Sequence, residues 1–488
     1  PSRTPGIHGA SRGRCVTRKT AVVVLAAGKG TRMRSARPKV LHKAAGRPLL
    51  DRVLSTAREV VAGEKAARLV VVTGPCDDDP IASHLRSAFP DVTGVPQASP
   101  RGTGDALRAA MEGVGDAKTI VVLPGDAPLV TTASVRRLLA ELEAGPDVPV
   151  AFLSAIVPNP SGYGRVVRDE RGTVVAVVEE RDASERQREI LEVNGGVYAF
   201  DRPFLETALP RLEPANAAAE LYLTDLLAMA AETGQPARGV SAPSPEEILG
   251  VNSQADLARV EGILRARAAA AAMEAGATLQ RPETITLDDT VVIAADTILE
   301  PFVTLLGAST VGEGTWIGQG CVLRDTLLGR NVTLLPYCIA EKTRIDDGAI
   351  VGPFARMREG TDLGPSVHIG NFVETKKAVL RKGAKANHLT YLGDVEVGER
   401  TNVGAGVITC NYDGFFKHRT TIGKDVFVGS DVQLVAPVSV GDGAVIGAGT
   451  TVTADIPSDA LATSRTPQQT TEGGGARYRK KKLEKKQK

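Results

Sequence analysis

A short glycine loop with nearby cations is the first group of residues in this chain that could do chemistry. The apolar run at residues 21–25 predicts a buried strand, and it leads directly into AAGKGTRM, residues 26–33. Such a loop after a strand holds phosphate in α/β proteins, because glycine lets backbone N–H groups approach an anion without a Cβ in the way. Lys29, Arg32 and Lys39 place positive charge around the loop. These residues suit a nucleoside triphosphate that loses pyrophosphate.

The glycine pair Gly28-x-Gly30 alone also fits an ordinary turn. The spacing GxxxxGK[ST] of a Walker loop is missing. The dinucleotide fingerprint GxGxxG is incomplete as well, because Met33 stands where the third glycine belongs. The cations around the loop, rather than the glycines, therefore favour a triphosphate.

An acidic residue follows a second predicted strand. Asp126, in PGDAPL, comes just after the apolar run 119–123. Open α/β sheets bind ligands at the carboxyl ends of their strands, and Mg²⁺ takes one or two carboxylates and completes its shell with phosphate and water. The alternative is an aspartate that caps a helix. Opposite a phosphate loop, Asp126 is predicted to be a Mg²⁺ ligand.

The elements that must position these residues alternate between strands and helices up to about residue 250. The runs 21–25, 69–73 and 119–123 predict buried parallel strands, and the stretches between them carry helical periodicity. Residues 253–275 are rich in strong helix formers and predict a helix that links two domains.

A six-residue repeat organises the chain from about residue 284 to residue 456. Every sixth residue from Ile422 is aliphatic: Ile422, Val428, Leu434, Val440, Ile446 and Val452. The same period appears earlier at Ile293, Leu299, Leu305, Val311 and Ile317. This period fits neither a helix nor an alternating strand, but it is typical of the hexapeptide parallel β-helix. A β-sandwich would not keep one phase through six successive repeats.

The six-residue period fails in three stretches, at residues 356–360, 375–391 and 411–417. Because a solenoid accommodates insertions as loops on its outside, we expect these stretches to be loops that carry function.

Composition excludes several classes of protein. The 488 residues predict two or three domains, and 59 Lys+Arg against 57 Asp+Glu give no reason to expect a nucleic-acid partner. Five cysteines without CxxC spacing indicate neither a disulfide framework nor zinc. No apolar run is long enough for membrane insertion. Residues 1–19 are basic without the apolar block of a signal peptide, so we expect a disordered extension and a cytoplasmic protein.

The motifs together resemble one family. LAAGKGTRM followed by PKVL is similar to the signature of sugar-nucleotide pyrophosphorylases. Joined to a hexapeptide coil, the chain resembles bacterial bifunctional N-acetylglucosamine-1-phosphate uridyltransferases/glucosamine-1-phosphate acetyltransferases over roughly residues 20–470. The resemblance implies an α/β plus all-β fold, with a Rossmann-like nucleotidyltransferase domain joined by a helical arm to a left-handed parallel β-helix. It also implies a homotrimer.

The predicted domains follow from the resemblance together with composition. They are a disordered extension at 1–19, a uridyltransferase domain at 20–251, a linker helix at 252–277, a β-helix acetyltransferase domain at 278–466, and a basic disordered tail at 467–488.

For the N-terminal domain the resemblance implies a site for UTP and the acceptor sugar phosphate. Arg32 and Lys39 would act in catalysis, and Asp126 and Asn252 would hold Mg²⁺. Pro124 stands where the family usually has an aromatic residue. The implied binding residues are Leu25, Ala26, Gly28, Lys39, Gln97, Gly102, Thr103, Gly125, Asp126, Gly164, Glu179, Asn194 and Asn252.

For the coil the resemblance implies an acetyl-transfer site. His388, in NHLTYLGD, matches the family's acetyl-transfer histidine, and a histidine suits removal of a proton from the attacking amine. The sugar phosphate would contact Arg358, Lys376, Tyr391, Asn402 and Lys417. Acetyl-CoA would contact Ala405, Asn411, Tyr412, Ser430, Ala448 and Arg465.

The resemblance implies two reactions: acetylation of glucosamine-1-phosphate by acetyl-CoA, and transfer of UMP from UTP to N-acetylglucosamine-1-phosphate. The product would be UDP-N-acetylglucosamine, a precursor of peptidoglycan and lipopolysaccharide. Two alternatives stay open. One is a pyrophosphorylase of another sugar or nucleotide whose coil serves only assembly or allostery, and the other is a non-enzymatic scaffold subunit.

Overall fold

A computed structural model describes residues 19–28, 30–64, 67–75, 79–145, 147–464 and 467–486. The chain divides into two units, Pro1–Leu264 and Arg265–Lys488. Apart from Lys19, the predicted N-terminal extension lies outside the described residues.

A mainly parallel sheet forms the centre of the N-terminal unit. Its strand β1 (Thr20–Leu25) pairs in parallel with β4 (Arg68–Thr73) on one side and β6 (Thr119–Pro124) on the other. The valines of β1 are buried on both faces of the sheet, which explains its continuous apolar run. The three strands predicted from the sequence are therefore confirmed.

The sheet has the order β11-β7-β10-β6-β1-β4-β5, and β8 and β9 attach beside β10. The other strands of the unit are β2 (Lys43–Ala44), β3 (Arg47–Pro48), β5 (Thr93–Pro96), β7 (Val150–Ile156), β8 (Arg165–Arg168), β9 (Val174–Val178), β10 (Glu192–Asp201) and β11 (Arg238–Ser241). The 3₁₀ helices are η1 (Thr31–Met33), η2 (Lys39–Leu41), η3 (Leu209–Arg211) and η4 (Pro245–Ile248).

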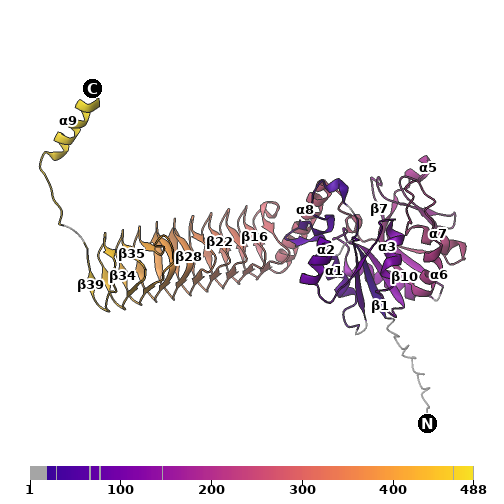
Figure 1. Cartoon of the computed structure of the whole chain (residues 1–488), viewed down its shortest axis with the longest axis horizontal. Helices are drawn as coiled ribbons and strands as arrows, with labels where there is room; N and C mark the ends of the chain where they lie inside the picture. The colour runs from indigo at the N-terminus through magenta and orange to yellow at the C-terminus, as the bar shows by residue number, and fades with distance from the viewer. Residues whose placement is uncertain are drawn as a thin grey trace, which may run out of the picture. The chain divides into compact units, whose positions relative to one another are not determined.

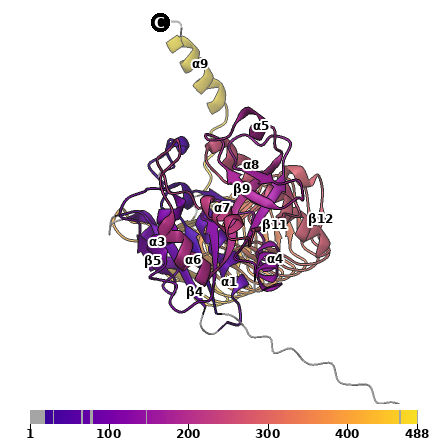
Figure 2. The same ribbon diagram turned by 90° about the vertical axis from the view of Figure 1, so that its right-hand side faces the viewer.

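Helices cover both faces of this sheet. The helices are α1 (Leu49–Val60), α2 (Pro80–Ala88), α3 (Thr103–Ala110), α4 (Thr132–Glu143), α5 (Glu185–Arg188), α6 (Arg202–Ala208) and α7 (Asp225–Glu232). Apolar residues of α1, α2 and α4 share one core with one face of the strands, and those of α3, α6 and α7 share another core with the opposite face. Figure 2 shows α4 beside β11 and α3 beside β5, as their contacts require.

The carboxyl ends of β1 and β6 are neighbours, because Leu25 pairs with Pro124. The glycine loop leaves the first of these strands and Asp126 follows the second. The topology therefore places the two sequence motifs at one edge of the sheet, as predicted.

The predicted linker helix forms as α8 (Gln254–Glu274). Val260 and Leu264 pack in the N-terminal unit with Met33 and Val251, and further along the helix Ala269 and Ala272 belong to the core of the second unit. The division between the units falls inside this helix, after Leu264. The domain boundaries given above remain predictions.

The second unit is a coil of short parallel strands that stack turn upon turn (Figure 1). Its 3₁₀ helix is η5 (Pro282–Thr284). The strands are β12 (Thr278–Leu279), β13 (Thr286–Leu287), β14 (Val292–Ile293), β15 (Ile298–Leu299), β16 (Thr304–Leu306), β17 (Thr310–Val311), β18 (Trp316–Ile317), β19 (Val322–Arg324), β20 (Leu327–Leu328), β21 (Thr333–Leu334), β22 (Ile339–Glu341), β23 (Arg344–Ile345), β24 (Ile350–Val351), β25 (Arg356–Met357), β26 (Asp362–Leu363), β27 (His368–Asn371), β28 (Glu374–Leu380), β29 (Lys385–His388), β30 (Tyr391–Val397), β31 (Asn402–Val403), β32 (Ile408–Cys410), β33 (Thr420–Ile422), β34 (Phe427–Val428), β35 (Gln433–Val435), β36 (Val438–Val440), β37 (Val445–Ile446), β38 (Thr451–Val452) and β39 (Leu461–Ala462).

The residues of the six-residue repeat point into the coil. All six from Ile422 to Val452 are buried, and so are Leu299, Leu305, Val311 and Ile317, while Ile293 is partly buried. The glycines that follow them are required by close packing: a Cβ on Gly429 would lie 2.5 Å from the backbone nitrogen of Ala448 in the next turn. The predicted β-helix is therefore confirmed.

Replacing Ile422 with alanine should lower the free energy of unfolding of the coil by about 2–5 kcal/mol, because the tightly packed turns cannot close the cavity that is left. Chemical denaturation of the full chain measures this change. Thr421→Ala is the matched control, since Thr421 is the exposed neighbour on the same strand, and its effect should stay within about 0.5 kcal/mol. Equal losses in the two variants would contradict the assigned interior.

Two of the three stretches predicted as outer loops are regular strands. Residues 356–357 form β25, and the stretch 375–391 contains most of β28, all of β29 and the start of β30. At residues 356–360 the six-residue period is kept, because Met357 is buried six positions after Val351 and six before Leu363. In the second stretch the spacing of buried residues shortens within the long strands β28 and β30, so no insertion is needed. The third stretch, around residues 411–417, is an outer loop closed by a bridge between Tyr412 and Lys417.

The basic tail, predicted to be disordered, contains the helix α9 (Gly474–Lys486), which buries no residue. Its Arg, Lys, Leu and Glu residues are strong helix formers, and this propensity explains the difference from the prediction. None of the helices in the described residues has both the length and the apolar content needed to cross a membrane.

Candidate active sites

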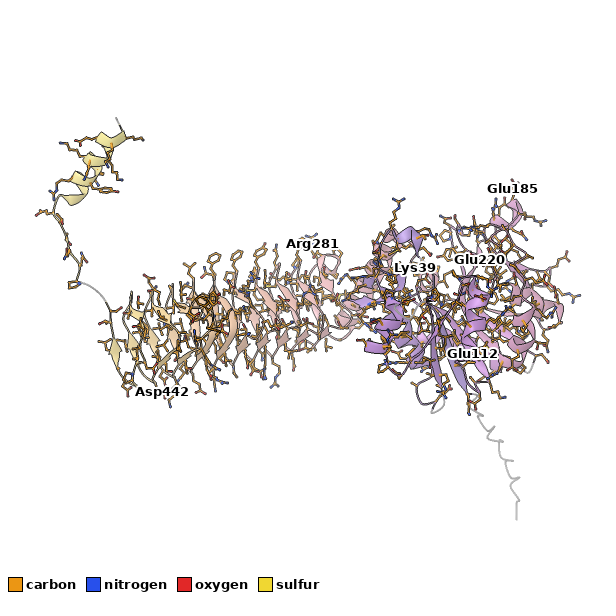
Figure 3. The ribbon with its side chains drawn as sticks, viewed as in Figure 1. Lys39, Glu112, Glu185, Glu220, Arg281 and Asp442 are labelled. Carbon is orange, nitrogen blue, oxygen red and sulfur yellow. The ribbon has the colours of Figure 1, made fainter. Side chains whose placement is uncertain are left out.

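A cavity of about 660 Å³ lies in the N-terminal unit, where β1 and β6 end. The predicted residues that line it are Leu25, Ala26, Gly28, Lys39, Gln97, Gly102, Thr103, Asp126, Glu179 and Asn194. Lys39 and Glu220, which both line the cavity, are labelled in Figure 3. The structure thus brings residues from the predicted nucleotide and acceptor sides to one cavity.

Four other predicted residues are not part of the described lining. Gly125 lies at the cavity edge, where its N–H donates to Leu25 O at 2.9 Å. Gly164 packs so closely that a Cβ would lie 2.9 Å from Val177 Cγ1. Asn252 touches the cavity residue Lys39.

Arg32, the fourth of these residues, is exposed on η1, whose buried residue is Met33. Burial of the Met33 side chain directs the neighbouring Arg32 to solvent. The catalytic role of Arg32 therefore stays a prediction without a contact in this structure. Lys29, the other cation of the loop, lies outside the described residues.

Lys39, Asp126 and Asn252 form one cluster at the cavity, although they are far apart in the sequence. The Lys39 ammonium forms an ion pair with Asp126 Oδ2 and donates to Asn252 Oδ1 at 3.1 Å. The side chains of Lys39 and Asp126 are mostly buried. One carboxylate and one amide oxygen that face a common cation are donors that suit Mg²⁺, whose shell substrate phosphates and water complete. The predicted metal ligands therefore fit the ion.

The start of α8 holds Asn252 in this cluster. Asp256 Oδ2 accepts hydrogen bonds from the backbone N–H groups of Asn252 and Ser253, at 3.0 and 2.8 Å. The Val251 N–H also donates to Asp126 O at 2.9 Å. These bonds tie the two predicted metal ligands to one another through the backbone.

The glycine loop turns sharply against Lys39. Gly30 has φ +57°, and a Cβ there would lie only 2.8 Å from the Cβ of Lys39. Both the left-handed conformation and the lack of space favour glycine at this position. The loop is therefore shaped to bring its backbone close to Lys39.

Gln97 is buried and lines the same cavity. Its Nε2 donates to Asp105 Oδ2 at 2.9 Å and to Gly102 O at 3.3 Å. These bonds fix the amide, which leaves Oε1 as an acceptor for a donor such as the imide N–H of uracil. Gly102 has φ +109°, and a Cβ on it would lie 2.5 Å from Leu221 O. The backbone at this turn therefore requires glycine.

The acceptor side is formed by polar residues on the antiparallel part of the sheet. Burial raises the pKa of the Glu179 carboxyl, which accepts a hydrogen bond from Thr224 Oγ1 at 3.3 Å. Asn194 Nδ2 donates to the hydroxyl of Tyr198 at 2.6 Å. The polar residues that line the cavity and that the sequence analysis missed are Thr31, Tyr198, Glu220 and Thr224. The sequence ELYLTD, which contains two of them, was the available signal.

Three cations gather on the coil. Hydrogen bonding with Lys417 and the positive charges of Lys417 and Arg358 lower the pKa of the Lys376 ammonium. Arg358 also pairs with Glu374 at 2.8 Å. A group of like charges held together in this way favours an anionic ligand such as a phosphate. The structure thus unites the residues predicted to hold the sugar phosphate.

Five residues stack at one corner of the coil in successive turns: Asn371, His388, Ala405, Ser430 and Ala448. Asn371 is in register with His388. Val403, Val428 and Ile446 are in register on β31, β34 and β37, and Ala405, Ser430 and Ala448 each lie two positions after one of them. We call this set the corner column. It contains the predicted catalytic histidine and three of the predicted acetyl-CoA contacts.

The other predicted contacts of the acetyl site lie on neighbouring parts of the same turns. Tyr391 begins the strand that follows the corner at His388, and Asn402 begins β31. Asn411 is buried, and its side chain donates to Asp394 Oδ2 at 2.5 Å. Tyr412 is exposed on the outer loop, where its hydroxyl donates to Gly414 O at 2.6 Å. Arg465 lies outside the described residues.

Asp413 organises this outer loop. Its Oδ1 accepts hydrogen bonds from Phe415 N and Phe416 N at 2.8 and 2.7 Å, and its Oδ2 pairs with His418 Nε2 at 2.7 Å. The bonds to Phe416 N, His418 and Phe415 N hold the pKa of this carboxyl at about 2. This value lies below the ordinary aspartate pKa of 3.8, so the bonds of the ionised carboxylate stabilise the folded loop. The stabilisation is fully present above pH 3.8 and is lost as the pH falls through about 2.

Replacing Asp413 with alanine should raise the KM for acetyl-CoA by about tenfold, because three hydrogen bonds that order the loop are lost. Steady-state kinetics of acetyl transfer at neutral pH measures this change. Glu399→Ala, which removes an exposed carboxylate elsewhere on the coil, is the control and should leave KM unchanged. An unchanged KM in the Asp413 variant would show that binding of acetyl-CoA does not depend on the hydrogen bonds of Asp413.

Comparisons with known proteins agree with the two kinds of site. A family profile described as MobA-like NTP transferase domain matches residues 22–193, and one described as bacterial transferase hexapeptide (six repeats) matches residues 419–454. They confirm the predicted fold class, a Rossmann-like nucleotidyltransferase domain followed by a left-handed hexapeptide β-helix.

Relatives match almost the whole chain. Bifunctional protein GlmU of Sorangium cellulosum is 45% identical over 94% of this chain and 96% of its own length. The proteins of the same name from Pelobacter propionicus and Bordetella parapertussis are 44% and 43% identical, over 94% and 93% of this chain and 99% and 98% of their own lengths. The chain therefore belongs to the bifunctional GlmU family, whose members combine a nucleotidyltransferase with a hexapeptide acyltransferase.

Proposed function

We propose that the chain makes UDP-N-acetylglucosamine in two steps, and that it thereby supplies precursors of peptidoglycan and lipopolysaccharide. The coil acetylates glucosamine-1-phosphate with acetyl-CoA, and the N-terminal unit then transfers UMP from UTP to the acetylated sugar phosphate. The observation that carries the proposal is the cluster of Lys39, Asp126 and Asn252 at a cavity that also holds Glu179 and Asn194. This cavity combines a triphosphate-binding end with a polar end that suits a sugar.

In the acetyl step, the amine of the sugar attacks the thioester carbonyl. The new C–N bond forms as the C–S bond breaks, and His388 takes the proton lost by the amine. The same proton passes from His388 to the sulfur, so CoA leaves as the free thiol. Lys376, Lys417 and Arg358 hold the phosphate of the sugar, and Tyr391 and Asn402 contact the sugar. The corner column and the outer loop bind acetyl-CoA through Ala405, Ser430, Ala448, Asn411 and Tyr412.

In the nucleotidyl step, a phosphate oxygen of N-acetylglucosamine-1-phosphate attacks the α-phosphorus of UTP. One O–P bond forms as the bond to the β-phosphate breaks, and pyrophosphate leaves. Lys39 binds the triphosphate, and Arg32 adds charge from the loop. Asp126 and Asn252 would hold Mg²⁺, which neutralises negative charge on the phosphates when bound.

The substrates are oriented by the two ends of the cavity. Gln97 and the turn at Gly102 receive the uracil, because the fixed amide of Gln97 keeps Oε1 free to accept a hydrogen bond. Glu179 and Asn194 receive the hydroxyl and amide groups of the sugar, and Thr224 supports Glu179. The protein works in the cytoplasm, where UTP and acetyl-CoA are available.

We also propose that the chain forms a homotrimer. Tyr337, Phe354 and Phe372 form an aromatic column along one corner of the coil, with ring centroids 5.3 and 5.6 Å apart. Each of these side chains is about half exposed. A continuous exposed column of this kind suits burial against further copies of the coil. Analytical ultracentrifugation should give three times the mass of one chain, and a monomer would contradict this assembly.

One mass-spectrometric time course tests both activities. The purified full chain is mixed with glucosamine-1-phosphate, acetyl-CoA, UTP and Mg²⁺. We expect free CoA and N-acetylglucosamine-1-phosphate first, and UDP-N-acetylglucosamine afterwards. If the sugar nucleotide forms only when N-acetylglucosamine-1-phosphate is supplied, the acetyl half of the proposal is wrong. If neither product forms, the chain is a scaffold rather than an enzyme.

A further inference from the structure

His388 has a side-chain partner in the preceding turn of the coil. Its Nδ1 lies 3.1 Å from Asn371 Oδ1. The two residues end the parallel strands β29 and β27, and their backbones are in register. Asn371 is half-buried, whereas His388 is exposed. The pair therefore joins two positions of the corner column whose backbones are held by the same sheet.

We propose that Asn371 is a positioning residue that fixes the tautomer of His388 with the proton on Nδ1. This inference rests on the proposed acetyl transfer, in which His388 is the base. An amide oxygen can only accept, so Nδ1 must carry the hydrogen of this bond. The lone pair of a neutral imidazole is then on Nε2, which is the nitrogen that can remove a proton from the attacking amine.

The partner of His388 is an amide, and this determines what the partner can do to the imidazole. Asn371 is neutral, so it orients the ring without the charge that a carboxylate would add. The nearby residues His368 and Lys385 are paired across the same two strands, and burial together with the charges of Lys385 and His388 lowers the pKa of His368. These two neighbours are therefore cationic or neutral. Asn371 is the residue that presents an acceptor to the ring of His388.

The opposite orientation of the Asn371 amide would have the opposite effect. With its NH₂ group toward His388, Nδ1 would accept the hydrogen bond and the proton would sit on Nε2. The nitrogen directed away from Asn371 would then have no lone pair with which to act as a base. Measuring the tautomer therefore separates a positioning role from mere stacking of side chains.

Solid-state ¹⁵N NMR of the full chain with ¹⁵N-labelled histidine makes this measurement. The chain has six histidines, and the signals lost in His388→Gln identify those of His388. We expect an unprotonated Nε2 and a protonated Nδ1 at a pH where the ring is neutral. A protonated Nε2 in the wild type would overturn the inference, whether or not the protein transfers acetyl groups.

Two substitutions of Asn371 add a kinetic test. Asn371→Leu removes the acceptor, so His388 should populate both tautomers and kcat for acetyl transfer should fall about tenfold with little change in KM. Asn371→Asp keeps an acceptor oxygen and should retain the Nδ1–H tautomer. An unchanged tautomer and kcat in the leucine variant would also overturn the inference.

Thr390→Val is the matched control for local packing. Its Oγ1 donates to the backbone carbonyl of His388 at 2.7 Å, so this bond is made to the backbone and not to the imidazole. The Thr390 variant should therefore leave the tautomer unchanged even if it loosens the turn. A wild-type protein that shows the expected tautomer without acetyl transfer would contradict the proposed function and leave the role of Asn371 in orienting the ring intact.

Discussion

Replacing Lys39 with methionine is expected to lower kcat for UMP transfer by about 10²–10³-fold, while acetyl transfer stays at the wild-type rate. The ammonium of Lys39 contacts both proposed metal ligands, Asp126 and Asn252, inside the cavity. Methionine keeps the length and the packing of the side chain but removes the charge that balances a triphosphate. Pyrophosphate release from UTP and N-acetylglucosamine-1-phosphate measures the loss, and CoA release measures the other reaction.

Lys43→Ala is the control for this experiment. Lys43 lies on the adjacent strand β2 and is exposed, so its removal changes the charge of the same segment without touching the cavity. It should leave both activities unchanged. If Lys39→Met retains full UMP transfer, the assignment of the cavity as the nucleotidyl site is wrong. If it loses both activities together, the substitution has unfolded the protein.

The second large effect is expected at His388. Replacement by alanine should lower acetyl transfer by about 10²–10⁴-fold, because the amine then loses its proton to water rather than to a positioned base. UMP transfer from supplied N-acetylglucosamine-1-phosphate should be unaffected. The two variants Lys39→Met and His388→Ala would then inactivate opposite halves of the chain. Mixed in one tube with glucosamine-1-phosphate, they should restore synthesis of the sugar nucleotide.

His368→Gln tests whether the effect belongs to His388 alone. His368 lies on the neighbouring strand β27, close enough for the charge of His388 to lower its pKa. It is the same type of residue on the same face of the coil, but it is not part of the corner column. We expect acetyl transfer to survive in this variant. An equal loss in the two histidine variants would remove the reason to single out His388.

The placement of the glycine loop and of Asp126 was predictable because strand ends set it. The apolar runs at residues 21–25 and 119–123 identify adjacent parallel strands, and that adjacency brings the glycine loop and Asp126 together. Tyr198 and Thr224 were missed although the motifs VNGGVY and ELYLTD contain them, because neither motif shows which of its side chains faces the cavity. Arg32 points to solvent because Met33, its neighbour on η1, is buried. The sequence of a loop does not show which of its side chains will be buried.

In the coil, the sequence predicted the interior better than the surface. The six-residue period identifies the aliphatic residues that point inward, because each is followed by a fixed turn. The residues that stack outside depend on the length of each turn, which changes where the strands lengthen at β28 and β30. The contact between Asn371 and His388 follows from that register, so it became visible only when the strands were paired.

The corner column also fixes a length along the coil that the proposed acetyl donor would have to span. Neighbouring strands lie about 4.8 Å apart, so the three steps from His388 to Ala448 span about 14 Å along the coil axis. In the acetyl transfer proposed above, acetyl-CoA would lie along this column with its thioester at His388. Removal of the last turns of the coil would then remove contacts with the donor at the end far from its thioester. In this proposal, the residues that bind the donor and the residue that acts at its thioester therefore lie on different turns of the coil.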